Sequence, residues 1–176
     1  MSDVFVARQP IFDRERRLVG YELLHRSTPT AVAAGHGDSS LMTGSVMVNS
    51  LLGIGLRQLT GGVRAWVNFG RESLLRHDFD LLDSRDYVIE LLESVECDDE
   101  TVEACRELRT RGFTLALDDF VADLQQYGPI VTQAQVIKIS VLGETEAQVR
   151  ASVTRLAGFP VKLLAEKVED KAMYEL

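Results

Sequence analysis

Six short apolar runs along this chain each end on a polar side chain that can hold a metal ion or a proton. The six polar positions are Glu22, Asn68, Glu90, Asp118, Lys138 and Glu166. Successive positions lie about 20 to 50 residues apart, which brackets the roughly 30 residues of a strand, a crossover helix and the next strand. This spacing predicts a βα-barrel in which the polar groups meet at the carboxyl ends of the strands.

The segments between these positions alternate between strand-like and helix-like patterns. We expect strands at Val4–Phe12, Leu18–Leu24, Val63–Phe69, Tyr87–Leu92, Phe113–Leu117, Gln135–Ser140 and Val161–Ala165. We expect helices at Leu41–Leu59, Arg71–Arg76, Asp98–Arg111, Leu124–Gln133 and Thr145–Ala157. Apolar strands that alternate with amphipathic helices favour a parallel sheet covered by helices, which is an α/β fold.

Seven strands are expected and no eighth, in a chain of 176 residues. A closed eight-stranded barrel typically needs ~250 residues. We therefore expect residues 1–176 to form a single barrel domain that is incomplete at its C-terminus and lacks the last strand and helix.

Composition excludes several classes of function. The net charge of −8 argues against binding a nucleic-acid polymer, which requires a basic face. No apolar run approaches the ~18 residues of a membrane span, so we expect a cytoplasmic protein without a membrane segment. The two cysteines, Cys97 and Cys105, form neither a disulfide framework nor a zinc motif.

The acidic positions predict a site for hard metal ions. Glu22, Asn68, Glu90, Asp118 and the adjacent Asp119 offer only oxygen donors. Such donors suit Mg²⁺ or Mn²⁺ rather than zinc. Two ions held there would activate a water molecule and stabilise the leaving oxygen of a phosphodiester.

Lys138 would then bind a phosphate oxygen or orient the water molecule, and Glu166 would accept the proton of that water. Each position also has an ordinary structural interpretation, because an acidic residue after a strand commonly caps a helix or lies in a solvated loop. Six such residues, each at the end of an apolar run, are an unlikely coincidence, and their number favours the metal site. Glu93 and Glu169, three residues further along, would start helices or hydrogen-bond the ligands.

Seven motifs in order resemble those of the EAL-domain cyclic di-GMP phosphodiesterases. They are Gln9–Ile11, Gly20–Arg26, Asn68, Glu90–Ser94, Asp118–Phe120, Lys138–Ile139 and Ala165–Glu169. The resemblance covers essentially the whole chain. It implies a TIM-like (β/α)₈ barrel with an antiparallel first strand, and Mg²⁺- or Mn²⁺-dependent opening of cyclic di-GMP to the linear dinucleotide.

The same resemblance implies a role for each matching residue. The first ion would be held by Glu22, Asn68, Glu90 and Asp118, and Asp119 would serve the second ion. Lys138 and Glu166 would position and deprotonate the water molecule. The nucleotide would be contacted by Gln9, Leu24 and Arg26.

Four departures from the family pattern bear on activity. The signature triplet reads Glu22-Leu23-Leu24, with Leu in place of Ala, and Ser140 replaces the family's Asp. Val121–Gln126 replaces the Gly- and Ser-rich loop that couples the second ion to dimerisation through the glutamate matched by Glu93. The glutamine of the final family strand would lie beyond Leu176.

With Ala7–Asp13, these departures resemble the subgroup in which an EAL domain precedes an HDOD domain, and whose members are often inactive. We therefore expect a cyclic di-GMP signalling domain with weak or lost phosphodiesterase activity. The alternatives are an active Mg²⁺-dependent phosphodiesterase and a non-catalytic interaction module. A following HDOD domain and a second copy of the chain are the expected protein partners.

Overall fold

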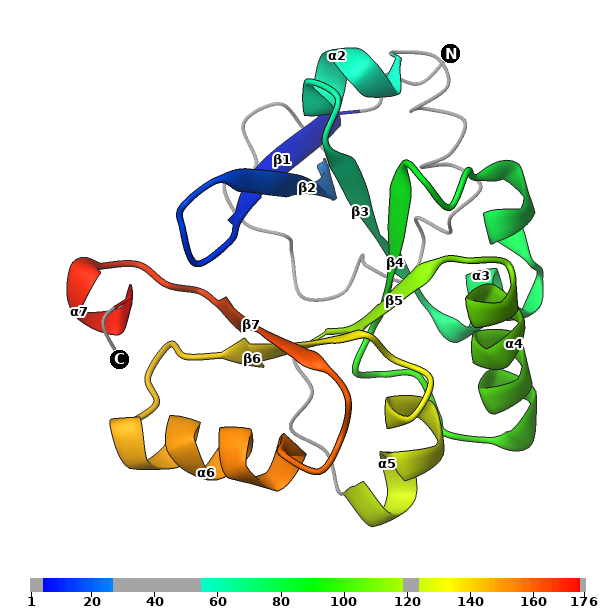
Figure 1. The fold of residues 1–176 in the computed structure, drawn as a ribbon. Coiled ribbons are helices and arrows are strands. Elements are labelled where there is room, and N and C mark those ends of the chain that lie inside the picture. Colours follow the sequence, from blue (N-terminus) through cyan, green and yellow to red (C-terminus); the bar gives the residue numbers. More distant parts are fainter. Residues whose placement is uncertain (1–4, 27–54, 119–123, 175–176) are drawn as a thin grey trace.

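A computed structural model describes residues 5–26, 55–118 and 124–174 (Figure 1). Seven strands form one curved sheet in the order of the sequence. They are β1 Phe5–Phe12, β2 Leu18–Arg26, β3 Arg64–Phe69, β4 Tyr87–Leu91, β5 Thr114–Leu117, β6 Val136–Ser140 and β7 Lys162–Glu166. β1 pairs with β2 in antiparallel fashion, and all later neighbours are parallel. The predicted strands and the antiparallel first strand are confirmed.

Helices pack on the outside of the curved sheet (Figure 1). They are α2 Leu56–Thr60, α3 Arg71–Leu75, the 3₁₀ helix η1 Asp78–Leu81, α4 Asp99–Thr110, α5 Leu124–Val131, α6 Glu146–Leu156 and α7 Lys171–Tyr174. The expected helix at Leu41–Leu59 lies largely outside the described residues. Sequence reasoning missed η1 and α7, because a single turn is too short to show a helical period. No described helix has both the length and the apolar character needed to cross a membrane.

The outer face of the sheet carries the main core. Side chains alternate between the two faces of a strand, so every second residue points outward. Val67, Ile89, Leu115 and Ile137 lie on this face and are at most 2% exposed. They share one cluster with residues of the covering helices, among them Leu108 of α4. Burial of this apolar surface is the main force that holds the helices on the sheet.

The inner face carries a second, smaller apolar layer, formed by Ile11, Trp66, Val88, Ala116 and Val136. Gly20 makes room for the largest of these side chains. A Cβ atom at Gly20 would lie 2.5 Å from Nε1 of Trp66, so only glycine lets the indole ring lie across β2. The concave side of the sheet is therefore filled by side chains rather than forming a pore.

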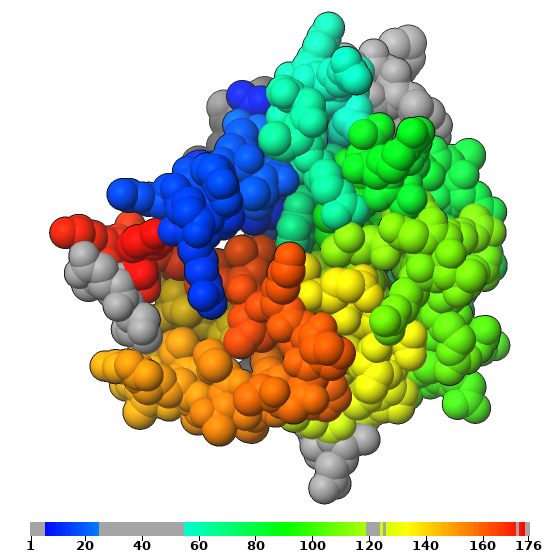
Figure 2. Space-filling view, in the orientation of Figure 1, coloured from blue at the N-terminus to red at the C-terminus, as the bar shows by residue number. Residues whose placement is uncertain are grey.

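The helices cover some strands of the sheet more completely than others. α4 is capped by Asp98, whose side chain accepts a hydrogen bond from the Thr101 amide, and it buries four residues, including Cys105. α6 begins with a capping box between Thr145 and Gln148 but buries Leu156 alone. Figure 2 shows the orange α6–β7 segment spread over the molecular surface. The last strand therefore lies at a thinly covered edge.

Candidate metal centre

Five of the six predicted polar residues lie inside strands, four of them within the expected strand ranges, whereas Glu166 was expected just beyond its strand. Glu22, Asn68, Glu90 and Lys138 are interior strand residues, and Glu166 is the last residue of β7. Only Asp118 follows its strand. The apolar runs ended at these residues because the inner face turns polar there, whereas the backbone pairing continues, for example between Phe69 and Leu91.

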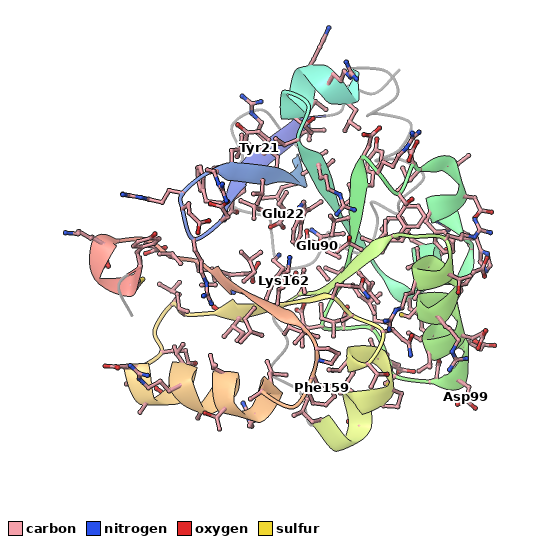
Figure 3. All side chains as sticks on the ribbon, viewed as in Figure 1. Tyr21, Glu22, Glu90, Asp99, Phe159 and Lys162 are labelled. Carbon is pink, nitrogen blue, oxygen red and sulfur yellow. The ribbon has the colours of Figure 1, made fainter. Side chains whose placement is uncertain are left out.

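The pairing register brings these positions into one layer. Asn68 lies opposite Glu90 in the β3–β4 ladder. Four of the six polar residues, Asn68, Glu90, Asp118 and Lys138, each follow a residue of the apolar layer by two positions, as Glu90 follows Val88. Figure 3 shows Glu22 and Glu90 within the ring of strands. The polar layer therefore lies directly above the apolar layer, toward the carboxyl ends of the parallel strands.

Lys138 of β6 lies at the centre of this layer. Its Nζ atom is 2.8 Å from Oε1 of Glu90, 2.7 Å from Oδ1 of Asp118 and 3.2 Å from Oε2 of Glu22. It also pairs with Oε1 of Glu166. The Lys138 side chain is only 2% exposed. Four carboxylates from four different strands or strand ends thus converge on one buried ammonium group.

Two oxygen atoms of the layer have neither a hydrogen-bond partner nor an ion pair among the described residues. They are Oδ1 of Asn68 and Oε2 of Glu90, and both are buried. The Asn68 amide instead donates its Nδ2 hydrogen to Oε1 of Glu22, at 3.4 Å. Buried polar atoms in native proteins nearly always have a hydrogen-bond partner. Unsatisfied acceptors beside a carboxylate cluster are what a bound cation would satisfy.

Burial and mutual repulsion shift the acidities within the layer. Burial, with the nearby Glu22 charge, raises the pKa of Glu90 well above its ordinary value. Burial likewise raises the pKa of Glu166 to about 7. Burial alone would lower the pKa of Lys138, but the surrounding carboxylates outweigh it and raise that pKa. Lys138 is therefore held in its charged form, and the two carboxyl groups with raised pKa values, Glu90 and Glu166, hold a proton more tightly than they would in water.

The donor chemistry of the layer fits a divalent cation. The donors are hard oxygens, which Mg²⁺, Mn²⁺ and Ca²⁺ prefer. Among residues 5–26, 55–118 and 124–174, no three Asp, Glu, His or Cys side chains are positioned together as the ligands of a metal ion. The four carboxylates turn toward Lys138 instead. A cation would thus use the same oxygens that the ammonium group now binds.

The remaining predicted residues lie at different distances from this layer. Gln9 of β1 pairs with Glu22 across the hairpin, on the same face, and is exposed. Leu24 lies two residues beyond Glu22 and is partly exposed. Glu93 and Glu169 are exposed loop residues that do not contact Lys138. Asp119 and the side chain of Arg26 lie outside the described residues, so their predicted roles remain predictions.

Sequence reasoning did not place two residues beside the layer: Trp66 was not a candidate, and Ser140 was named only as a departure from the family's Asp. Trp66 lies on the inner face two residues before Asn68, and Ser140 pairs with Glu166 in the β6–β7 ladder. The available signal was the two-residue alternation of a strand, which places Ser140 on the face of Lys138 and Trp66 on the face of Asn68.

Comparison with known proteins relates the chain to two longer curated proteins, while no protein-family model matches it. The chain is 35% identical to the uncharacterized protein YuxH of Bacillus subtilis, over 98% of this chain and 43% of that protein. It is 34% identical to the cyclic di-GMP phosphodiesterase CdgJ of Vibrio cholerae, over 96% of this chain and 39% of that protein. The chain thus spans less than half the length of each relative.

A solved structure shares the fold. The Bacillus subtilis YkuI protein, which has an EAL domain and was solved in complex with substrate cyclic di-GMP and calcium, superposes with a TM-score of 0.73 at 18% identity. The superposition covers 98% of this chain and 51% of that protein chain.

Proposed function

Because the chain belongs to the EAL-domain family, we propose that residues 1–176 form one cyclic di-GMP signalling domain with a metal centre on the inner face of the sheet. We propose that its phosphodiesterase activity is weak or lost. The observation that carries the proposal is the convergence of Glu22, Glu90, Asp118 and Glu166 on one point.

Cyclic di-GMP is the proposed ligand because the similar proteins act on it or bind it. CdgJ is named a phosphodiesterase of this dinucleotide, and YkuI was solved with it. The dinucleotide would lie over the polar layer, against the exposed Gln9 and the partly exposed Leu24. A phosphate there requires a cation, because the surrounding carboxylates would otherwise repel it.

The proposed cation is Mg²⁺ or Mn²⁺, with Ca²⁺ as the ion found in YkuI. The residues that would hold it are Glu22, Asn68, Glu90 and Asp118, whose oxygens are already gathered or lack hydrogen-bond partners. The bound ion would polarise the phosphodiester and lower the pKa of a water molecule.

The other residues of the layer handle the water molecule and its proton. Lys138 would bind a phosphate oxygen or orient the attacking water. Glu166, with a pKa raised by burial to about 7, is matched to accept a proton near neutral pH. Attack of the water oxygen on phosphorus would break one phosphodiester bond and leave the linear dinucleotide.

Two alternatives have specific support. An active phosphodiesterase is supported by the gathering of four of the five predicted metal ligands, Glu22, Asn68, Glu90 and Asp118, in one layer. A non-catalytic interaction module is supported by the exposed apolar side chains of the edge, such as Leu163 at 38% and Val153 at 42% exposure. For that module the proposed partners are a following HDOD domain or a second copy of this chain.

Calorimetric titration with cyclic di-GMP, with and without Mg²⁺, alongside chromatography of the linear product, tests these functions. We expect Mg²⁺-dependent binding with little or no product. The substitution Glu22→Ala should abolish binding, whereas Glu103→Ala, on the exposed surface of α4, should not change it. Rapid product formation would establish the active enzyme, and no binding under any condition would overturn the proposal in favour of the interaction module.

A further inference from the structure

The ammonium group of Lys138 occupies the point toward which the carboxylates of the layer turn. Its Nζ atom lies 2.7 and 2.8 Å from oxygens of Asp118 and Glu90, which are full charge-assisted contacts. Glu90 is completely buried, so no solvent molecule can hydrogen-bond to its carboxylate. The lysine therefore performs, in the metal-free protein, the charge neutralisation that a metal ion would otherwise provide.

A divalent ion and this ammonium group cannot share the same oxygens. Mg²⁺ requires ligands at roughly 2.0–2.1 Å in near-octahedral geometry, which leaves no room for an ammonium group in the same ring of oxygens. The two cations also repel each other strongly at distances of a few ångströms in a buried site. Binding of the ion thus requires Lys138 to give up several of its present contacts.

The four carboxylates differ in how easily they can follow a moving ammonium group. Glu90 lies in β4, all of whose residues are buried, whereas Glu166 ends the edge strand β7 and pairs with a single neighbouring strand. The side chain of Glu166 is 13% exposed, against 0% for that of Glu90. Displacement of the ammonium group toward Glu166 would keep one strong ion pair and free the oxygens of Glu22, Glu90 and Asp118.

We infer that Lys138 is a resident counter-ion that competes with the divalent ion for these carboxylates, and that Glu166 is the positioning residue that retains the displaced ammonium group. This inference rests on the proposed metal centre. It gives Lys138 a role in setting metal affinity, separate from any contact with a phosphate or a water molecule.

Calorimetric titration of the chelator-treated chain with Mn²⁺ tests the inference without any activity measurement. We expect Lys138→Met to bind Mn²⁺ at least tenfold more tightly than wild type, because the competitor is gone. Lys138→Arg keeps the charge and should not bind more tightly. Lys162→Met, which removes an exposed lysine of β7, should match wild type. An unchanged or weaker affinity in Lys138→Met would overturn the inference.

The variant Glu166→Gln tests the same competition at a more exposed position, in case Lys138→Met does not fold. It should weaken Mn²⁺ binding several-fold, since the displaced ammonium group has lost its alternative partner. Glu144→Gln, which neutralises an exposed carboxylate after β6, should not. Equal affinities of Glu166→Gln and wild type would contradict the inference.

Different results overturn the competition at Lys138 and the metal centre itself. Mn²⁺ binding by wild type, with no gain in Lys138→Met, would overturn the competition alone. No Mn²⁺ binding by wild type or by any folded variant would overturn both the competition and the metal centre.

Discussion

Strands β4 and β7 each deliver one carboxylate to Lys138, yet they lie in opposite surroundings. All five residues of β4 are buried, and the strand has a neighbour on each side. Among the strands that the structure describes, β7 pairs with β6 alone, and three of its five residues are exposed. The fully buried Glu90 is thus held rigidly by its neighbours, whereas Glu166 is held by one ladder. The polar layer thus contains one carboxylate on a fully buried strand, Glu90, and one on a more exposed strand, Glu166.

The covering helices repeat the contrast. α4 buries Thr101, Ala104, Cys105 and Leu108 against the sheet, whereas α6 buries Leu156 alone. Free energy of folding is therefore concentrated around β3–β5, and the β6–β7 side is the part that can move at least cost. The difference shows that polar residues of one layer can lie on strands with very unequal packing.

The largest expected effect compares matched leucines on the outer faces of the two regions. Leu115→Ala in β5, at 0% exposure, should lower the free energy of unfolding by about 2–5 kcal/mol through the cavity it leaves. Leu163→Ala in β7, at 38% exposure, should cost less than about 1 kcal/mol. Urea denaturation followed by circular dichroism measures both, and equal losses would contradict the contrast.

An intermediate effect concerns the pH dependence of the metal-free protein. Burial raises the pKa of Glu166 from 4.5 to about 7, so the folded state holds this proton more tightly than the unfolded state. Its stabilising effect is therefore present below about pH 4.5 and is lost as the pH rises toward 7. After allowance for partial solvent exposure, about 2 kcal/mol should disappear across this window.

Melting temperatures of the chelator-treated chain at successive pH values measure this change. Glu166→Gln cannot ionise and should flatten the profile between pH 4.5 and 7. A profile that keeps its full slope in the variant would assign the pH dependence to other groups.

The smallest expected effect compares the two helix caps. Thr145→Ala removes the capping box of α6 and should cost about 1 kcal/mol or less, because little of that helix is packed. Asp98→Ala should destabilise the chain more, since Asp98 caps the well-packed α4 and also pairs with Arg71 at 2.5 Å. Thermal melts of the two variants rank them, and a larger loss in Thr145→Ala would reverse the proposed distribution of stability.

The sequence predicted the kinds and order of the elements well because buried parallel strands are nearly continuous apolar runs. β4 and β6 are examples, with predicted and observed ranges that differ by a residue or so. It also predicted which polar residues gather, since each interrupts such a run. Asp98–Arg111 was predictable from its acidic first turn and its cap.

The arrangement inside the layer was not predictable in the same way. That Lys138 contacts four carboxylates follows from the register between strands far apart in the sequence, which no local pattern specifies. The exposure of β7 likewise depends on how few neighbours it has in space. The sequence thus named residues that gather, and the structure adds the contacts of Lys138 with four carboxylates. The assignment of Lys138 to a phosphate or the water molecule stays a prediction.

Trp66 gives this chain a built-in optical probe. It is the single tryptophan among 176 residues, and its indole ring lies over Gly20, one layer below the carboxylates. Fluorescence excited at wavelengths that only tryptophan absorbs thus comes from this one side chain, which lies at the floor of the site. Emission from Trp66 reports on the packing of the sheet interior and on the charge above it, without any attached dye.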